Sequence, residues 1–124
     1  MIRDSYDRIL ICGDRNWTDK QYIREVLESL ETKPKYIIEG EANGADTCGK
    51  NVAKELGIPI MTFPAEWDKY GLSAGYIRNK RMLDEGKPNI VLAFHDDISN
   101  SKGTKNMLEI AKNAGIRTVL YKHE

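Results

Sequence analysis

Residues 8–13 read Arg8-Ile9-Leu10-Ile11-Cys12-Gly13, a short and nearly unbroken apolar run that ends in glycine. Consecutive apolar residues leave no polar face, which is typical of a strand that is covered on both sides. Parallel strands are buried in this way because the helices that connect them lie on the two faces of the sheet. This stretch therefore predicts the first strand of an α/β sheet.

The rest of the chain alternates between helical and strand patterns. Thr18 with Gln21 forms a capping-box pattern, and the apolar residues that follow share one helical face, which predicts a helix over residues 19–31. Similar patterns predict helices over residues 45–56, 73–85 and 103–114, and strands over residues 35–39, 58–63, 89–94 and 116–121. Such alternation requires right-handed crossovers. The predicted fold is α/β, a Rossmann-like three-layer sandwich with a mostly parallel sheet of about five strands.

Length and charge limit the class of protein. The 124 residues fit one domain, so a single ligand-binding domain is expected over residues 1–124. Nineteen Lys and Arg residues balance nineteen Asp and Glu residues, so the chain lacks the net positive charge on which non-specific nucleic-acid binding relies. Nucleic acid is therefore disfavoured as a partner. No apolar run approaches the roughly 20 residues that cross a bilayer, and the N-terminus lacks a signal-peptide pattern, which predicts a cytoplasmic protein with no membrane partner.

Metal-binding residues are few. Cys12 and Cys48 have no C-x-x-C spacing and lack enough histidine partners for a zinc site, because only His95 and His123 are present. Neither a metal nor a cofactor is predicted. Both cysteines are expected to be reduced and buried, and His123 is expected to lie in a frayed tail.

Polar residues and glycines follow the predicted strands, and in parallel sheets ligands bind at the carboxyl ends of the strands. The sequence therefore predicts one ligand site formed by several of these segments. The candidate ligand-binding residues are Gly13, Asp14 and Arg15; Gly40, Asn43, Gly44, Ala45 and Asp46; Trp67; Arg78 and Asn79; and His95, Lys102, Gly103 and Thr104.

Two glycine-rich helix starts suit an anion. Gly44-Ala45 and Gly103-Thr104 each open a predicted helix, where free N–H groups and the helix dipole favour phosphate. The alternative is that these glycines only permit tight turns. Arg78 has a planar guanidinium suited to phosphate or carboxylate, or else is an ordinary solvated charge on its helix.

Other candidate residues also have both a ligand-binding and a purely structural interpretation. Trp67 and Tyr70 either stack on a base or pack a long loop onto the sheet. Asp14, Asp46 and Asp96 either bind ribose hydroxyls or cap helices.

One motif suggests a different class of protein, but its match to the pattern of that class is incomplete. Residues 44–50 match most of a Walker A pattern, but Asn51 stands where a Ser or Thr would hold Mg²⁺, and Asp46 would place a negative charge in the phosphate cradle. A P-loop NTPase is therefore disfavoured.

The order of several motifs resembles the YspA-like branch of the SLOG superfamily. The residues that carry this resemblance are Gly13-Asp14-Arg15, residues 40–46, Trp67 with Tyr70-Gly71, Ala74-Gly75, Arg78-Asn79 with Met82, Ala93-Phe94 and Lys102-Gly103-Thr104. The resemblance implies a Rossmann-like fold that binds a nucleotide or a nucleotide-derived signal. The superfamily also contains the LOG phosphoribohydrolases and the DNA-processing protein DprA.

The comparison with LOG enzymes bears on catalysis. Arg78 and Met82 fit the R-x-x-x-M part of the LOG pattern, but Met107 stands where the catalytic glutamate of the second part is expected. Cleavage of an N-glycosidic bond needs a positioned carboxylate to activate water, and a thioether cannot do this. Glu39, Glu41, Asp46 or Asp96 would have to replace it, and the sequence selects no catalytic residue among them.

The sequence therefore predicts a protein that senses, sequesters or carries a nucleotide-derived ligand such as ADP-ribose or an NAD-related molecule. The alternative is a nucleotide-processing N-glycosidase or phosphoribohydrolase. Single-strand nucleic-acid binding like that of DprA is disfavoured by the zero net charge. A homo-oligomer is an expectation that rests only on the frequency of symmetrical assemblies.

Overall fold

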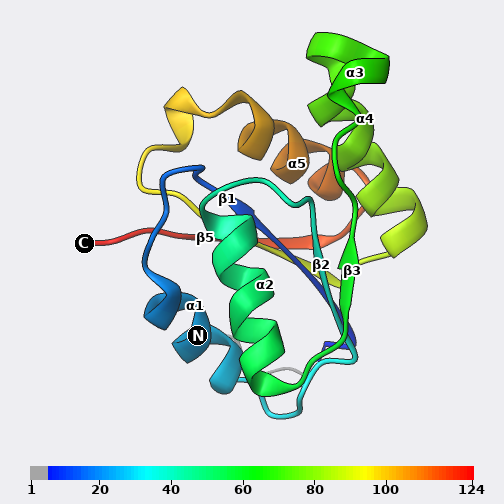
Figure 1. The fold of residues 1–124 in the computed structure, drawn as a ribbon. Helices are drawn as coiled ribbons and strands as arrows, with labels where there is room; N and C mark the ends of the chain where they lie inside the picture. Colours follow the sequence, from blue (N-terminus) through cyan, green and yellow to red (C-terminus); the bar gives the residue numbers. More distant parts are fainter. Residues whose placement is uncertain (1–5) are drawn as a thin grey trace.

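The structure is a computed structural model that describes residues 6–124 and contains a sheet of five parallel strands (Figure 1). The strands are β1 (Arg8–Gly13), β2 (Tyr36–Glu39), β3 (Ile60–Thr62), β4 (Ile90–Phe94) and β5 (Arg117–Tyr121). Their order across the sheet is β3-β2-β1-β4-β5, and every neighbouring pair is parallel. The predicted α/β fold with a mostly parallel sheet of about five strands is confirmed.

The chain reverses its direction across the sheet at one place. From β1 it moves outward through β2 to β3, and then returns to the other side of β1 to form β4 and β5. Gly13 at the end of β1 lies opposite Phe94 at the end of β4. Because the connections after β1 and β4 leave toward opposite faces, a crevice opens beyond this pair of strand ends.

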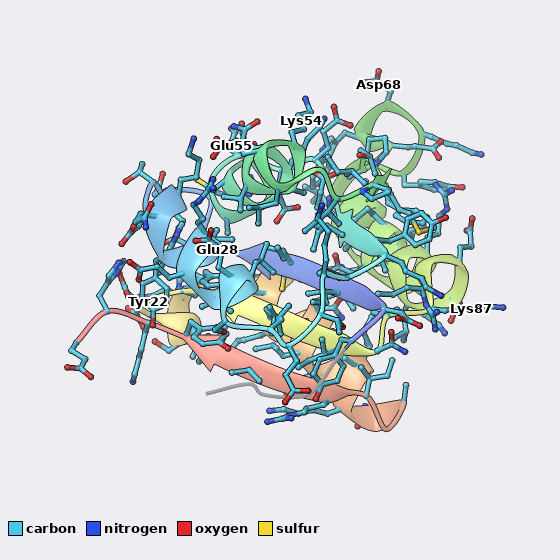
Figure 2. The ribbon with its side chains drawn as sticks, turned by 90° about the horizontal axis from the view of Figure 1, so that it is seen from below. Tyr22, Glu28, Lys54, Glu55, Asp68 and Lys87 are labelled. Carbon is cyan, nitrogen blue, oxygen red and sulfur yellow. The ribbon has the colours of Figure 1, made fainter. Side chains whose placement is uncertain are left out.

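The helices form a layer on each face of the sheet (Figures 1 and 2). They are α1 (Lys20–Glu28), α2 (Ala45–Leu56), α3 (Trp67–Tyr70), α4 (Ala74–Arg81) and α5 (Lys102–Asn113). One core joins Ile9 and Ile11 of β1 to α1 and α2, and a second core joins Leu10 and Cys12 to Met82, which directly follows α4, and to α5. Successive residues of β1 thus face opposite layers, which explains why the strand is apolar throughout.

Helix α1 is shorter than predicted, and a different residue caps it. Asp19, and not Thr18, is the N-cap, since its carboxylate accepts a hydrogen bond from the N–H of Tyr22 at 3.0 Å. At the other end the Ser29 hydroxyl donates to the carbonyl of Val26 at 2.6 Å. This side chain competes for a helix carbonyl, and the helix ends at Glu28 instead of residue 31.

The segment between β3 and β4 contains more helix than predicted. The expected long loop includes α3 and a 3₁₀ turn (Gly71–Ser73), and the expected helix over residues 73–85 is α4 followed by a π-helical turn (Met82–Gly86). Gly86 packs against Ile38, so that an added Cβ would lie 3.1 Å from its Cδ1 atom. These turns bring α3 and α4 over the carboxyl ends of β2 and β3.

The expectation that the tail frays at His123 is wrong. The ring of His123 lies between two carboxylates, with Nε2 2.7 Å from Asp19 Oδ2 and Nδ1 2.9 Å from Asp96 Oδ2. It also stacks on Trp17, with 4.5 Å between ring centroids. The C-terminal tail is therefore fixed to the start of α1 and to the loop after β4.

Both cysteines are free thiols, but only Cys12 is buried as predicted, and Cys48 is half-buried. Burial raises the pKa of the Cys12 thiol, which keeps it protonated. Within residues 6–124, no group of three or more His, Cys, Asp and Glu side chains is placed to hold a metal ion. No helix in the same range has the length and apolar character needed to span a membrane.

Candidate functional site

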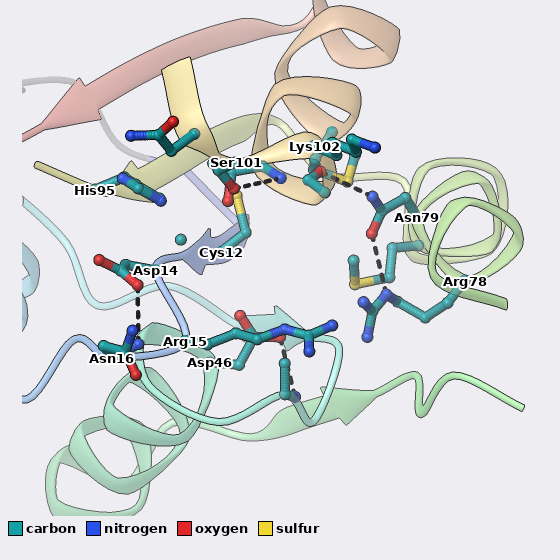
Figure 3. Close-up of a pocket in the computed structure, with 17 residues that line it drawn as sticks. Cys12, Asp14, Arg15, Asn16, Asp46, Arg78, Asn79, His95, Ser101 and Lys102 are labelled. Carbon is teal, nitrogen blue, oxygen red and sulfur yellow. Dashed lines mark hydrogen bonds between the residues drawn. The ribbon is translucent and has the colours of Figure 1, made fainter. Parts of the chain in front are cut away.

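A cavity of about 360 Å³ lies beyond the carboxyl ends of β1 and β4 (Figure 3). Its walls come from both halves of the chain. Many of the candidates that the sequence suggested line it, namely Gly13, Asp14, Arg15, Asp46, Arg78, Asn79, His95, Lys102, Gly103 and Thr104. The structure thus brings together loops that follow three different strands.

Close packing of β1 against β4 fixes the floor of this cavity. A Cβ atom on Gly13 would lie 2.1 Å from the carbonyl oxygen of Phe94, so only glycine allows this approach. The next residue, Asp14, donates its N–H to the same oxygen at 2.9 Å. Its carboxylate accepts from the N–H of Asn16 at 2.9 Å and forms a tight turn, so Asp14 does not cap a helix. This turn directs Arg15 toward the cavity.

Gly44 and Ala45 do not line the cavity. The N–H of Ala45 donates to the carbonyl oxygen of Asp14 at 2.9 Å. The backbone of Asp14 therefore occupies the space in front of the first turn of α2. Gly44 has a φ of 75°, and its added Cβ would lie 2.1 Å from the same oxygen. Close packing and backbone conformation therefore account for this glycine, and the first turn of α2 is partly closed to a ligand.

The start of α5 is open by comparison. Ser101 caps the helix, since its hydroxyl accepts from the N–H of Thr104 at 3.3 Å. An added Cβ on Gly103 would meet no atom within 4 Å. The side-chain amide of Asn79 donates to the Gly103 carbonyl at 3.2 Å and holds α5 against α4. A helix start with free space in front of it suits an anion, and Lys102 adds a positive charge there.

Asp46 is a buried carboxylate in the wall of the cavity. Its Oδ2 atom accepts hydrogen bonds from the N–H groups of Gly40 at 2.9 Å and Ala42 at 3.3 Å. It therefore organises the loop before α2 and does not cap the helix. Burial raises the pKa of Asp46 to about 6, against the opposing effect of the Arg78 charge. This carboxyl group titrates close to neutral pH.

Arg78 is half-buried and is not an ordinary solvated helix charge. Its Nη1 atom donates to the carbonyl oxygen of Gly40 at 2.5 Å, and its Nε atom donates to Asn79 Oδ1 at 3.0 Å. Burial lowers the pKa of Arg78, the charge of Asp46 raises it, and the charge of Arg15 lowers it. In Figure 3 the side chains of Arg15 and Arg78 extend toward one another from opposite sides of the cavity. Two positive groups thus face a shared space.

A second cavity of about 420 Å³ adjoins the first. Gly40, Asn43 and Trp67 line it, and both Arg15 and Arg78 belong to the two cavities. The Trp67 side chain is 48% exposed. The exposed part of this residue is accessible beside the second cavity, which Trp67 lines.

Two comparisons place the chain among known proteins. The sequence model of the YspA, cpYpsA-related SLOG family matches residues 7–70. The chain is also similar to the Gene 61 protein of Mycobacterium phage D29, with 30% identity over 126 aligned positions that cover 90% of this chain and 94% of the phage protein. The chain belongs to the YspA, cpYpsA-related SLOG family. Membership indicates binding or processing of a nucleotide-related ligand at the level of the family.

The residues that match this SLOG family model include β1, β2, α2 and the loops after the two strands. These segments supply Asp14, Arg15 and Asp46 to the first cavity. The remaining walls come from α4 and the turn after it, from the segment between β4 and α5, and from α5 itself, all of which follow the matched residues. The resemblance seen in the sequence to the YspA-like SLOG branch is therefore confirmed at the level of the family.

Sequence reasoning missed several residues that line the first cavity. Cys12, Met82 and Met107 form part of the first cavity, together with Asn16, Ala42, Asn100 and Ser101. Asn16 lies in the loop after β1, and Asn100 and Ser101 lie in the segment between β4 and α5, positions that point to the site. The apolar ones could not be separated from the core by pattern. Met107 stands at the place of the expected glutamate, and its side chain is buried.

Glu39 is the other buried carboxyl group near the strand ends. Its Oε1 atom accepts from the N–H of Glu41 at 2.9 Å, and within residues 6–124 its Oε2 atom has no hydrogen-bond partner. Burial raises its pKa. Since Glu39 lines neither of the two cavities, it is badly placed to contact a ligand there.

Proposed function

We propose that this SLOG family member binds a nucleotide or a nucleotide-derived ligand, such as ADP-ribose or an NAD-related molecule, in the cavity beyond β1 and β4. The observation that carries the proposal is the convergence of Arg15, Arg78 and the open start of α5 on one cavity. These groups come from separate segments, yet all of them favour an anion. Phosphate is the anionic part of every nucleotide.

The position of the cavity supports the same proposal. It lies at the point where the chain reverses direction across the sheet, which is where ligands bind in open parallel sheets. Its volume falls within the range of about 300–1,000 Å³ that is usual for small-molecule sites. We place a phosphate group between Gly103 at the start of α5 and the guanidinium groups, with Lys102 at the rim.

Hydrolysis of an N-glycosidic bond is the second candidate, and Asp46 is the observation that favours it. A general acid or base works best when its pKa is close to the working pH, and that of Asp46 is about 6. Asp46 borders the cavity, whereas the expected glutamate position holds the buried Met107. Binding without cleavage is nevertheless the leading proposal, because two N–H groups already hold one oxygen of Asp46.

Calorimetric titration with AMP, ADP, ADP-ribose and NAD⁺ tests the proposal. Arg78→Ala is expected to weaken binding of the best ligand roughly 10- to 150-fold, since a charge-assisted contact contributes about 1.5–3 kcal/mol. Arg81→Ala is the matched control, because Arg81 lies on the same helix but pairs with Glu85 outside the cavities. Equal affinities of both variants and wild type would remove Arg78 from the site.

Product analysis separates the two candidates. Binding alone predicts that the ligand is recovered intact after long incubation with the protein. Steady release of free base or ribose 5-phosphate, lost in Asp46→Asn, would establish the enzyme instead.

A further inference from the structure

His95 presents one hydrogen-bond donor to the first cavity, and we infer that this donor selects an uncharged hydrogen-bond acceptor on the nucleoside part of the ligand. The inference rests on the proposed function and adds a specificity-determining residue to the same site. His95 directly follows β4 and lines the cavity there. The phosphate position at Gly103 is unaffected, because the inference concerns the other part of the ligand.

Hydrogen bonds fix the tautomer of the His95 ring. Its Nδ1 atom accepts from the backbone N–H of Asp97 at 3.0 Å, and a backbone N–H group is able only to donate. The ring proton is therefore on Nε2. The backbone of His95 is held as well, since its own N–H donates to the carbonyl oxygen of Tyr121 at 3.0 Å. The direction of the Nε2–H group is thus set before a ligand binds.

The Nε2–H group of His95 has no hydrogen-bond partner within residues 6–124. The residue is only 8% exposed, yet it lines the cavity. A buried donor without a partner is costly, because it has given up most of its contact with water and gained no other hydrogen bond. An acceptor atom of a ligand in the cavity would remove this cost.

The two ends of the cavity differ in charge. Because Gly13 pairs with Phe94, the two residues that follow them are neighbours at the ends of β1 and β4. These residues are Asp14 and His95, and Figure 3 shows both at one end of the cavity and Arg78 at the opposite end. The negative charge of Asp14 repels a phosphate beside it. The acceptor that meets His95 therefore belongs to an uncharged part of the ligand.

Asp14 also provides an acceptor next to this donor. Its Oδ1 atom accepts from the N–H of Asn16 at 2.9 Å, and its carboxylate lines the same cavity as His95. A hydroxyl group is able to accept from His95 and to donate to Asp14, and the polar edge of a base offers the same combination. The pair therefore suits either a ribose hydroxyl or a base edge, both of which are uncharged.

Two substitutions of His95 separate ligand recognition from a structural role. Asparagine retains an acceptor near the position of Nδ1 but has no group at Nε2, whereas glutamine places an amide donor near Nε2 and lacks the Nδ1 acceptor. In calorimetry with ADP, His95→Asn should weaken binding about 2- to 12-fold, and His95→Gln should retain more of the affinity. If His95 serves only to hold Asp97, the order of the two variants is reversed.

Fragments of the ligand identify the group that His95 contacts. Inorganic pyrophosphate has no nucleoside, so His95→Asn should leave its affinity unchanged while Arg78→Ala lowers it. If His95→Asn weakens both ribose 5-phosphate and ADP, the acceptor is on the ribose. If it weakens ADP alone, the acceptor is on the base. Equal losses for pyrophosphate and ADP would show that His95 contacts phosphate, and would overturn the inference.

Nitrogen NMR of the imidazole rings adds a measurement on the wild-type protein. The chain has two histidines, and His123 binds Asp19 and Asp96 outside both cavities, so its ring is the internal control. The free protein should show the His95 proton on Nε2, and ADP should shift this resonance more than those of His123.

A proton on Nδ1 of His95, or an unchanged affinity of His95→Asn for ADP, would overturn the inference while the proposed function stands. If wild type binds none of AMP, ADP, ADP-ribose and NAD⁺, the proposed function fails, and the inference fails with it.

Discussion

The Nη1 atom of Arg78 donates a hydrogen bond to the carbonyl oxygen of Gly40 at 2.5 Å and links α4 to the end of β2. The contact requires the absence of a side chain at residue 40, because a Cβ atom there would lie 2.4 Å from Nη1. The backbone of Gly40 lies outside the left-handed region, so close approach of the arginine is what demands glycine.

Gly40→Ala is therefore expected to displace Arg78 and to weaken ligand binding about as much as Arg78→Ala, roughly 10- to 150-fold. The arginine side chain can move, so the melting temperature should fall only slightly. Calorimetry on the double variant provides the control. Its affinity should match that of Arg78→Ala alone, and additive losses would show that Gly40 acts by another route.

Gly103→Ala should separate binding from stability. No atom of the protein lies within 4 Å of the added methyl group, and alanine favours helix by up to about 1 kcal/mol over glycine. The melting temperature should stay the same or rise slightly. Affinity should fall, because the methyl group occupies the space in which we place the phosphate. Unchanged affinity would move the phosphate away from the start of α5.

Asp46→Asn should change the pH dependence of stability. Burial raises the pKa of Asp46 from 3.8 in the unfolded chain to about 6, so the folded protein binds this proton more tightly. Ionisation therefore destabilises the fold above pH 6, and the effect disappears as the pH falls toward 4. The melting temperature of the variant minus that of wild type should be more positive at pH 7.5 than at pH 4.5. A difference that does not vary with pH would contradict the assignment.

His123→Ala should lower the melting temperature more in mild acid than in base. Hydrogen bonds to Asp19 and Asp96 raise the pKa of His123 from 6.5, so its stabilising effect is complete below pH 6.5 and is lost as the pH rises through the raised value. The same contacts lower the pKa values of both carboxyl groups from 3.8, so the ion pairs persist at pH 5.5.

Thermal melts of His123→Ala at pH 5.5 and pH 9 measure this effect. Loss of the stacking contact with Trp17 contributes at both values. Lys122→Ala is the control, because the contact of Lys122 with Tyr22 uses only its backbone carbonyl. An equal loss at the two pH values would leave stacking as the whole contribution of His123.

The fold was accessible from the sequence because local pattern determines it. The unbroken apolar run of β1 and the helical spacing of apolar residues in α2 predicted these two elements. Tertiary contacts did not change either of them. The ends of the helices were harder to predict from the sequence. Side-chain hydrogen bonds of Asp19 and Ser29 determine where α1 begins and ends. The helical turns over Trp67–Tyr70 and Gly71–Ser73 escaped prediction because each is very short and buries no apolar residue that would mark a helical period.

The site was predictable in position but less so in detail. Loops after parallel strands must meet at one edge, and this rule placed Arg15 and Lys102 together. It could not show that the Asp14 carbonyl occupies the start of α2, because that contact joins two loops distant in the sequence. For the same reason the raised pKa of Asp46 and the contacts of His123 could be seen only in the structure.

The pairing of β1 with β4 has a consequence for the kinetics of unfolding. These adjacent strands join the segment that runs from β1 to β3 with the segment that contains β4, α5 and β5. A ligand that contacts both Arg15 and Gly103 connects the two segments across their shared boundary. Opening of the sheet there would then require release of the ligand, so proteolysis and amide exchange should slow throughout the central strands, including places that no ligand atom touches.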